Sequence, residues 1–247
     1  MANNVAETGA TSASQGSLSL LSRFIGIVTS PKATFQAVVA YPKWFGMLAL
    51  VTLIVAVGVT LPLTTEAGRR AQLDQQVDAM ENFGVQVTDE MYARMEEGSR
   101  RAAITTFISI LVAGPVMSVI LGGILFGVFT IFMGGQASFK TFFAVYVHST
   151  VITAVAQIFM GPFNYFRGSM SSATNLAVLL PMLDEKSFIG RLFGLIDLFW
   201  IWWLVVLAIG LGVLYRRRTQ SIAFALFGVY VVCIVLIAAV MSMFGRS

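Results

Sequence analysis

Five long apolar runs, separated by shorter polar segments, dominate the pattern of this chain. They cover residues 44–63, 104–133, about 142–160, about 193–214 and about 222–244. A helix needs about 20 predominantly apolar residues to cross the ~30 Å hydrocarbon core of a bilayer. The pattern therefore predicts an all-α fold: a polytopic membrane helical bundle with about five transmembrane helices, forming a membrane domain over 44–246.

The second run is longer than one crossing requires. As one helix it would reach about 45 Å, and Gly114-Pro115 lies about a third of the way along it. Proline removes a backbone donor and kinks a helix. Two separate spans would each be too short, so we expect one tilted or bent helix.

An amphipathic segment over 17–43 precedes the first run. Four apolar residues share one helical face, with Arg23 off that face: Leu18, Leu21, Ile25 and Val28. Ser30 and Pro31 then supply a cap and a first-turn proline for a second short helix. With basic residues nearby, this pattern is typical of a helix lying in the membrane interface. The alternative is an ordinary helix packed on the edge of the bundle.

The segment 64–103 is the only long aqueous stretch, and it predicts a helical hairpin. Leu73 belongs to an apolar stripe, residues 82–84 interrupt it, and Thr88 caps a second helix. The segment carries five arginines against eight acids, a net charge of −3. It is either a solvated hairpin or a docking surface for a partner.

Two further segments are predicted to lie outside the spans. Residues 1–16 are polar and small, without a signal-peptide pattern, and predict a disordered tail. The connection 161–190 contains an apolar stretch, 176–183, that is too short to cross a bilayer. We expect an interfacial or re-entrant turn there, broken by Pro181.

Composition agrees with a membrane location. The chain is 57% hydrophobic and 11% charged, whereas soluble domains carry about 25% charged residues. The net charge of +4 lies in segments beside the apolar runs, where basic residues set orientation, so no nucleic-acid partner is expected.

Orientation rests mainly on Arg216, Arg217 and Arg218, three consecutive cations in a very short connection. They favour a cytoplasmic N-terminus, because cytoplasmic links are enriched in Lys and Arg. The total count of basic residues opposes this choice mildly, with seven inside against nine outside.

Little in the sequence points to chemistry. The single histidine, His148, excludes a paired-histidine zinc site, and neighbouring Ser149 points to another helix face. No hydrolase or nucleotide-binding motif occurs, so we expect a non-enzymatic protein without cofactor or metal. His148, Gln157 and Asp197 are the intramembrane polar candidates. They either line a small cavity or path, or form structural hydrogen bonds.

Small residues spaced four apart predict close helix packing, since they let backbones approach. The candidates are Ser118 with Gly122, Gly123 with Gly127, and Ala208 with Gly212.

Several of these features together resemble the YIP1 family of five-span membrane proteins, in a bacterial form. They are Ser30-Pro31-Lys32 with Phe35, Trp44 opening the first span, the polar hinge 134–140, Asp197 followed by an aromatic run to Trp203, and the glycines of 208–212. The resemblance covers residues 18–243. The Asp-Leu-Tyr-Gly-Pro stretch of eukaryotic members, which are associated with small GTPases, is absent, so GTPase binding is not inferred.

The resemblance implies a scaffold or accessory protein of a bacterial cytoplasmic membrane, with its N-terminus in the cytoplasm. Besides the lipid bilayer, its expected contacts are a membrane protein partner, such as an ABC-type export system, or a second copy of the chain. The alternative is a small transporter or channel with a polar path near His148 and Gln157.

Overall fold

The described part of the chain is helical. The computed structural model describes residues 18–134, 136–170, 172–180, 182–184 and 187–244. Within those ranges one isolated bridge, between Asn175 and Asp197, is the only β-pairing. The predicted tail at 1–16 and Pro181 lie outside the described residues.

The helices follow one another with short connections. The elements are α1 (Leu20–Thr29), α2 (Pro31–Ala40), α3 (Phe45–Thr60), the 3₁₀ turn η1 (Pro62–Thr64), α4 (Glu66–Asn82), α5 (Asp89–Ser99), α6 (Ala102–Met133), α7 (Phe139–Ser149), α8 (Val151–Arg167), the 3₁₀ turn η2 (Leu176–Leu179), α9 (Phe188–Gly194), α10 (Leu198–Tyr215) and α11 (Thr219–Phe244).

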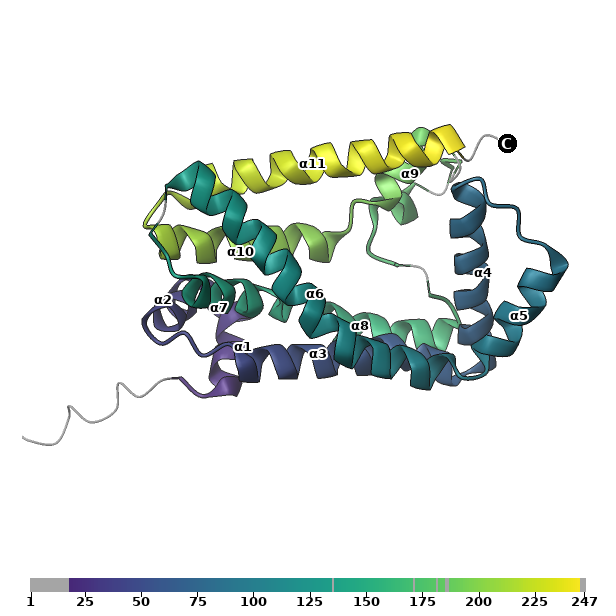
Figure 1. Ribbon diagram of the computed structural model, residues 1–247, viewed down its shortest axis with the longest axis horizontal. Helices are drawn as coiled ribbons and strands as arrows, with labels where there is room; N and C mark the ends of the chain where they lie inside the picture. The colour runs from purple at the N-terminus through teal and green to yellow at the C-terminus, as the bar shows by residue number, and fades with distance from the viewer. Residues whose placement is uncertain (1–17, 135, 171, 181, 185–186, 245–247) are drawn as a thin grey trace, which may run out of the picture.

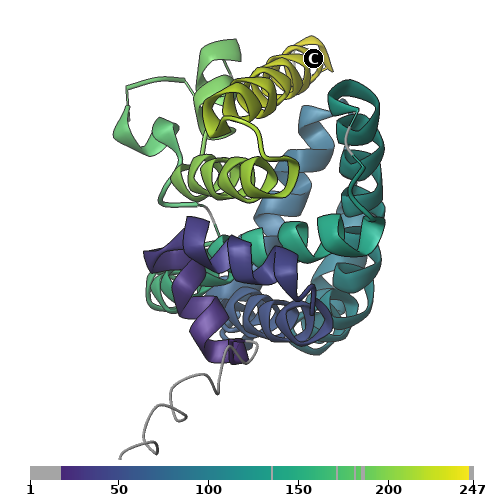
Figure 2. The same ribbon diagram turned by 90° about the vertical axis from the view of Figure 1, so that its left-hand side faces the viewer.

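The long helices form a bundle with two different ends. Helices α3, α8, α10 and α11 run along the long axis, and α6 crosses them diagonally (Figure 1). Helix α3 packs against α6 and α8, whereas α10 packs against α11. Helices α1, α2 and α7 gather at one end, seen face-on in Figure 2, and α4, α5 and α9 lie at the other. We call these the basic end and the hairpin end.

The prediction of a polytopic helical membrane bundle is confirmed. Within the described residues, four apolar helical segments are long enough to cross a membrane: Ala102–Ile131, Leu198–Tyr215, Thr219–Met243, and Phe139–Arg167, which consists of the consecutive helices α7 and α8. The first predicted span is shorter, since α3 has 16 residues, about 24 Å of helix. The turn η1 extends it toward the hairpin end, where η1 also contacts α8.

The second run forms a single helix, as predicted. Helix α6 continues through Pro115 and ends at Gly134, which adopts the left-handed conformation that glycine tolerates at a C-cap. A Cβ on Gly114 would lie 3.4 Å from Thr52 of α3, an ordinary contact. Almost none of α6 is buried by the rest of the chain, so most of its surface is free to meet lipid or a partner.

The third and fourth runs are divided differently from the prediction. The third run is interrupted at Thr150, where the hydroxyls of Ser149 and Thr150 bond to carbonyls one turn back, at 2.6 and 2.7 Å. Such bonds compete with the helical ladder. Helix α7 is therefore separate, is buried over 142–149, and crosses the basic end, while α8 runs beside α3 (Figures 1 and 2). The fourth run begins at Leu198, not near Phe193, because Asp197 caps α10.

The N-terminal helices pack with one face and expose the other. On α1, Leu21 and Ile25 of the predicted apolar stripe are 64% and 51% exposed, while Arg23 and Ile27 are buried. Helix α2 buries Phe35 and Val38 in the core. The exposed stripe is what a helix in the interface requires, while the inner faces fit the alternative of a helix packed on the bundle.

The predicted hairpin is present as α4 and α5. Thr65 and Thr88 cap the two helices by accepting bonds from the N–H groups of Gly68 and Met91, at 3.0 and 3.3 Å. Leu73 is buried toward the bundle. Helix α5, in contrast, has no buried residue and packs against α4.

Candidate functional site

His148 lies buried in α7 with both ring nitrogens bonded. Its Nδ1 lies 2.7 Å from the carbonyl oxygen of Ala144, and its Nε2 lies 3.3 Å from Nη1 of Arg23. A carbonyl only accepts, so Nδ1 carries the proton and Nε2 accepts a bond from the guanidinium. This arrangement suits a neutral imidazole held in one orientation.

Arg23 connects α1 to this histidine. Its Nη1 also donates to the carbonyl oxygen of Lys43, at 2.8 Å, in the connection between α2 and α3. Burial lowers the pKa of the Arg23 guanidinium from its usual value, although an arginine stays charged at neutral pH. The interaction therefore joins α1, α7 and the connection that leads into α3.

Ser149 turns away from His148, as predicted, and binds elsewhere. Its hydroxyl donates to the carbonyl oxygen of Tyr146 and accepts from Nε1 of Trp203 at 3.1 Å. This second link fastens α7 to α10. The two adjacent polar residues thus serve two different helix contacts.

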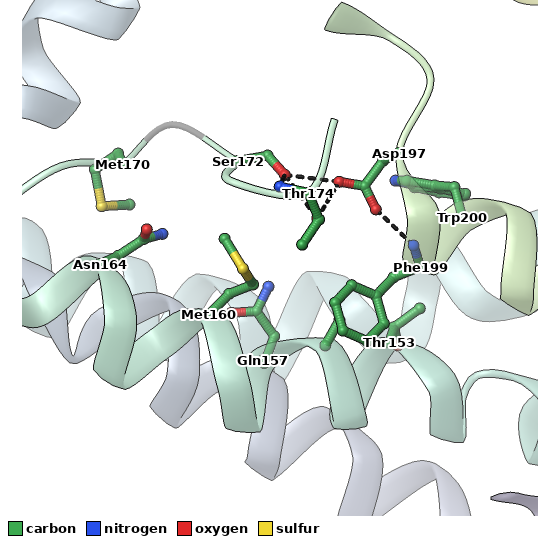
Figure 3. A pocket seen from close by; sticks show the side chains of 11 residues that line it. Thr153, Gln157, Met160, Asn164, Met170, Ser172, Thr174, Asp197, Phe199 and Trp200 are labelled. Carbon is green, nitrogen blue, oxygen red and sulfur yellow. Dashed lines mark hydrogen bonds between the residues drawn. The ribbon is translucent and has the colours of Figure 1, made fainter. Parts of the chain in front are cut away.

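A polar cavity lies between α8 and the start of α10, near the hairpin end. It encloses about 290 Å³, and its polar lining residues are Thr153, Gln157, Asn164, Ser172, Thr174 and Asp197 (Figure 3). Gln157 and Asp197, predicted separately, therefore line one cavity. His148 is not among its lining residues.

Asp197 organises the side of this cavity that faces the 168–176 connection. One carboxylate oxygen accepts from the hydroxyls of Ser172 and Thr174, both at 2.6 Å, and the other accepts from the N–H of Phe199 at 2.8 Å. The first pair holds the connection to α10, and the last caps the helix (Figure 3). Asp197 sits at the start of its helix, not deep within it.

Helix α8, which carries the cavity residue Gln157, packs on α3 through two glycines that the sequence patterns did not single out. A Cβ on Gly161 of α8 would lie 2.8 Å from the carbonyl oxygen of Gly58 in α3, and a Cβ on Gly58 would lie 2.7 Å from Cβ of Gln157. Both contacts are shorter than real Cβ atoms allow. Gly58 lies in the first apolar run and Gly161 directly after the third, and the sequence does not show that these two segments meet.

The predicted packing candidates fall into different environments. Gly122 is buried on α6, and a Cβ there would lie 2.8 Å from the ring of Phe143; Ser118, one turn earlier, is half-buried. A Cβ on Gly123 or Gly127 would meet nothing within 4 Å. The second pair therefore faces away from the described bundle.

The predicted pair on α10, Ala208 and Gly212, makes two different contacts. Ala208 is fully buried in the core. Gly212 lies under the link to α11, where a Cβ would come within 2.9 Å of the Thr219 hydroxyl. The link itself, with the topology candidates Arg216, Arg217 and Arg218, is exposed at the basic end.

This arrangement offers few reactive groups. The cavity holds one carboxylate, and both of its oxygens accept hydrogen bonds from the protein. Among the described residues, no three His, Cys, Asp or Glu side chains gather to hold a metal ion.

A lengthwise bundle of long apolar helices, whose backbone polar groups bond within each helix, defines an integral membrane protein of the helical class. The Yip1 domain profile matches residues 25–241, most of the chain, so the protein belongs to the Yip1 family. It is also similar to the membrane protein YknW of Bacillus subtilis (strain 168), with 22% identity over 245 residues, covering 94% of each chain. No solved structure matches the chain significantly.

Proposed function

We propose that this protein is a non-enzymatic scaffold or accessory subunit of a bacterial cytoplasmic membrane. It holds a membrane protein partner through the hairpin α4–α5. The family resemblance suggests an ABC-type export system as the class of partner. The observation that carries the proposal is the unburied helix α5.

Helix α5 lacks the packing that normally stabilises a short helix. It has 11 residues, none of them buried, and isolated helices of this length are marginal in water. Four acids against Arg94 give it a net charge of −3, and Tyr92 is 40% exposed on it. An acidic helix with an exposed aromatic side chain is suited to bind a basic, partly apolar surface.

The transporter alternative has less support. A path near His148 and Gln157 would need both side chains to face one cavity, but the polar cavity includes only Gln157. Both nitrogens of His148 are engaged by Ala144 and Arg23. We therefore favour the scaffold.

The charges at the two ends support a cytoplasmic N-terminus. The basic end carries seven cations: Arg23, Lys32, Lys43, Lys140, Arg216, Arg217 and Arg218. All acids within the described ranges lie on α4, α5 and the connections at the hairpin end. The opposite side carries nine cations, so the support comes from the density of Arg216 to Arg218 in one short link, which favours the cytoplasm.

Affinity purification in a mild detergent tests the proposal. The wild type should recover one membrane protein near equal stoichiometry, and Tyr92→Ser combined with Glu96→Lys should lower that recovery about tenfold, as expected for a central interface residue. Tyr41→Ser is the matched control, since Tyr41 is exposed at the basic end. Recovery of no stoichiometric partner, or equal losses in both variants, would refute the proposal.

A further inference from the structure

The geometry points to a binding site for the phosphate headgroup of an anionic phospholipid at the basic end. The site is a pocket of about 500 Å³ between α2 and the α10–α11 link. We call it the basic pocket, and its polar lining residues are Lys32, Gln36, Arg216, Arg217, Arg218 and Thr219. It is separate from the hairpin and from the polar cavity.

The link that carries the three arginines is held in an uncommon shape. Arg216 caps α10 in the left-handed conformation, at φ 52°, which residues other than glycine seldom adopt. The N–H of Arg217 donates to the carbonyl oxygen of Gly212 at 3.0 Å. Since Gly212 has no side chain, the link can fold back over the last turn of α10. Backbone strain of this kind persists where the surroundings fix it, often at binding sites.

The fourth cation comes from a distant part of the sequence. Phe35 of α2 is fully buried, and a Cβ on Gly210 of α10 would lie 2.9 Å from its ring. This close approach brings α2 onto the end of α10. Lys32 and Gln36 are one turn apart on α2 and so share the face that lines the pocket.

The charges of the pocket are not neutralised by the protein. None of Lys32, Arg216, Arg217 and Arg218 forms an ion pair in the described part of the chain. No acid is among the lining residues. Four cations around one hollow repel each other, and a bound anion would remove that repulsion.

The first turn of α11 adds uncharged hydrogen-bond donors to the basic pocket. Thr219 lines the pocket and begins a helix of 26 residues. The N–H groups of a first helical turn have no partner within the helix and favour an anion. Arginine forks match phosphate oxygens, and the hydroxyl of Thr219 and the amide of Gln36 supply further donors.

The depth of the pocket selects a lipid rather than a soluble anion. It lies where α10 ends, at Tyr215, and where α11 begins, at Thr219. The ends of spanning helices lie at the level of the headgroups, where basic pockets between helices bind anionic lipids. A phospholipid can place its phosphodiester headgroup in the pocket while its acyl chains lie along the spanning helices.

Native mass spectrometry of the purified full chain tests the site. The probes are phosphatidylglycerol and phosphatidylcholine, added to the protein in detergent. Inorganic phosphate is added separately, as a soluble anion that could occupy the same pocket. We expect one phosphatidylglycerol to bind at least about tenfold more tightly than phosphatidylcholine. Each cation removed should weaken binding about fivefold, so Lys32→Gln with Arg217→Gln should lose about 25-fold. Raising the salt concentration should weaken wild-type binding.

The matched control removes two cations at the hairpin end. Arg100→Gln with Arg101→Gln, both exposed before α6, should leave the affinity unchanged. Equal binding of the two lipids, or an equal loss in the control, would overturn the inference. Full competition by phosphate at the concentration of the lipid would overturn the assignment to a lipid. If the double variant folds poorly, Lys32→Gln alone tests the site. Lys32 is exposed, and its replacement should weaken phosphatidylglycerol binding about fivefold.

Discussion

At the scale of single residues, the contact between Gly58 and Gly161 tests how α3 packs against α8. Adding one methyl group at Gly161 would press on the backbone of α3, which cannot move without shifting the helix. We predict that Gly161→Ala lowers the free energy of unfolding by about 1–3 kcal/mol, the usual cost of overpacking. Thermal unfolding in detergent measures the loss.

Gly123→Ala is the matched control, because a Cβ there meets nothing within 4 Å. It should change the unfolding temperature of the isolated protein little. If Gly123→Ala were the more damaging change, α6 would pack with the opposite face from the one described. A loss seen with Gly123→Ala only in native membranes would instead indicate a partner on that face.

The residue scale also shows how far the sequence could predict the site. His148, Gln157 and Asp197 stood out because polar side chains are rare in apolar runs. Their partners could not be predicted, since Arg23 is 125 residues from His148 and Ser172 is 25 residues from Asp197. Those partners lie in short polar segments, where a single arginine or serine is unremarkable. Long-range packing alone brings them together.

At the scale of elements, a helix start in a polar segment was predictable, whereas the starts and breaks of helices inside apolar runs were not. Thr88 supplies a cap that pattern and chemistry predict together, and α5 begins directly after it. The break between α7 and α8 depends on hydroxyl bonds from Ser149 and Thr150. In sequence those residues look like ordinary members of a span. Hydropathy therefore predicts that an apolar helix exists but does not predict where it bends.

Because Asp197 caps α10, its replacement should destabilise the protein. Replacing it by Ala removes the cap of α10 and both bonds to the 172–174 segment. We predict a loss of about 2–4 kcal/mol in the free energy of unfolding, from one lost cap and two charge-assisted bonds. Chemical unfolding in mixed micelles measures it.

Ser172→Ala with Thr174→Val is the companion variant, since it keeps the cap and removes the two hydroxyl bonds. It should cost less than Asp197→Ala and should increase proteolysis within the 168–176 connection. An Asp197→Ala protein as stable as the wild type would show that the connection is held by other contacts.

At the scale of the whole molecule, the two ends of the bundle should face opposite sides of the membrane. Helices α3, α6, α8 and α11 run between the two ends, and α10 lies alongside α11 from the basic end (Figure 1). In a chain with the exposed Cys233 replaced by Ser, Thr29→Cys should react with an impermeant maleimide only after the cytoplasmic side is opened. Glu97→Cys should react in intact cells.

Labelling of both cysteines from the same side would mean that one of these helices does not cross. Labelling of Glu97→Cys only from the cytoplasm, with Thr29→Cys outside, would reverse the orientation inferred from the basic end. The second result would leave the fold intact and would remove the charge argument from Arg216 to Arg218.

Photo-cross-linking in native membranes tests most directly whether this protein works by holding a partner. A photoreactive phenylalanine analogue replaces Tyr92 on α5 or, as the control, Tyr41 at the basic end; the two tyrosines are 40% and 54% exposed. If α5 is the docking helix, position 92 gives one discrete adduct with a membrane protein, and position 41 does not. If position 92 gives no adduct, or the same diffuse products as position 41, the hairpin holds no partner and the scaffold function is wrong.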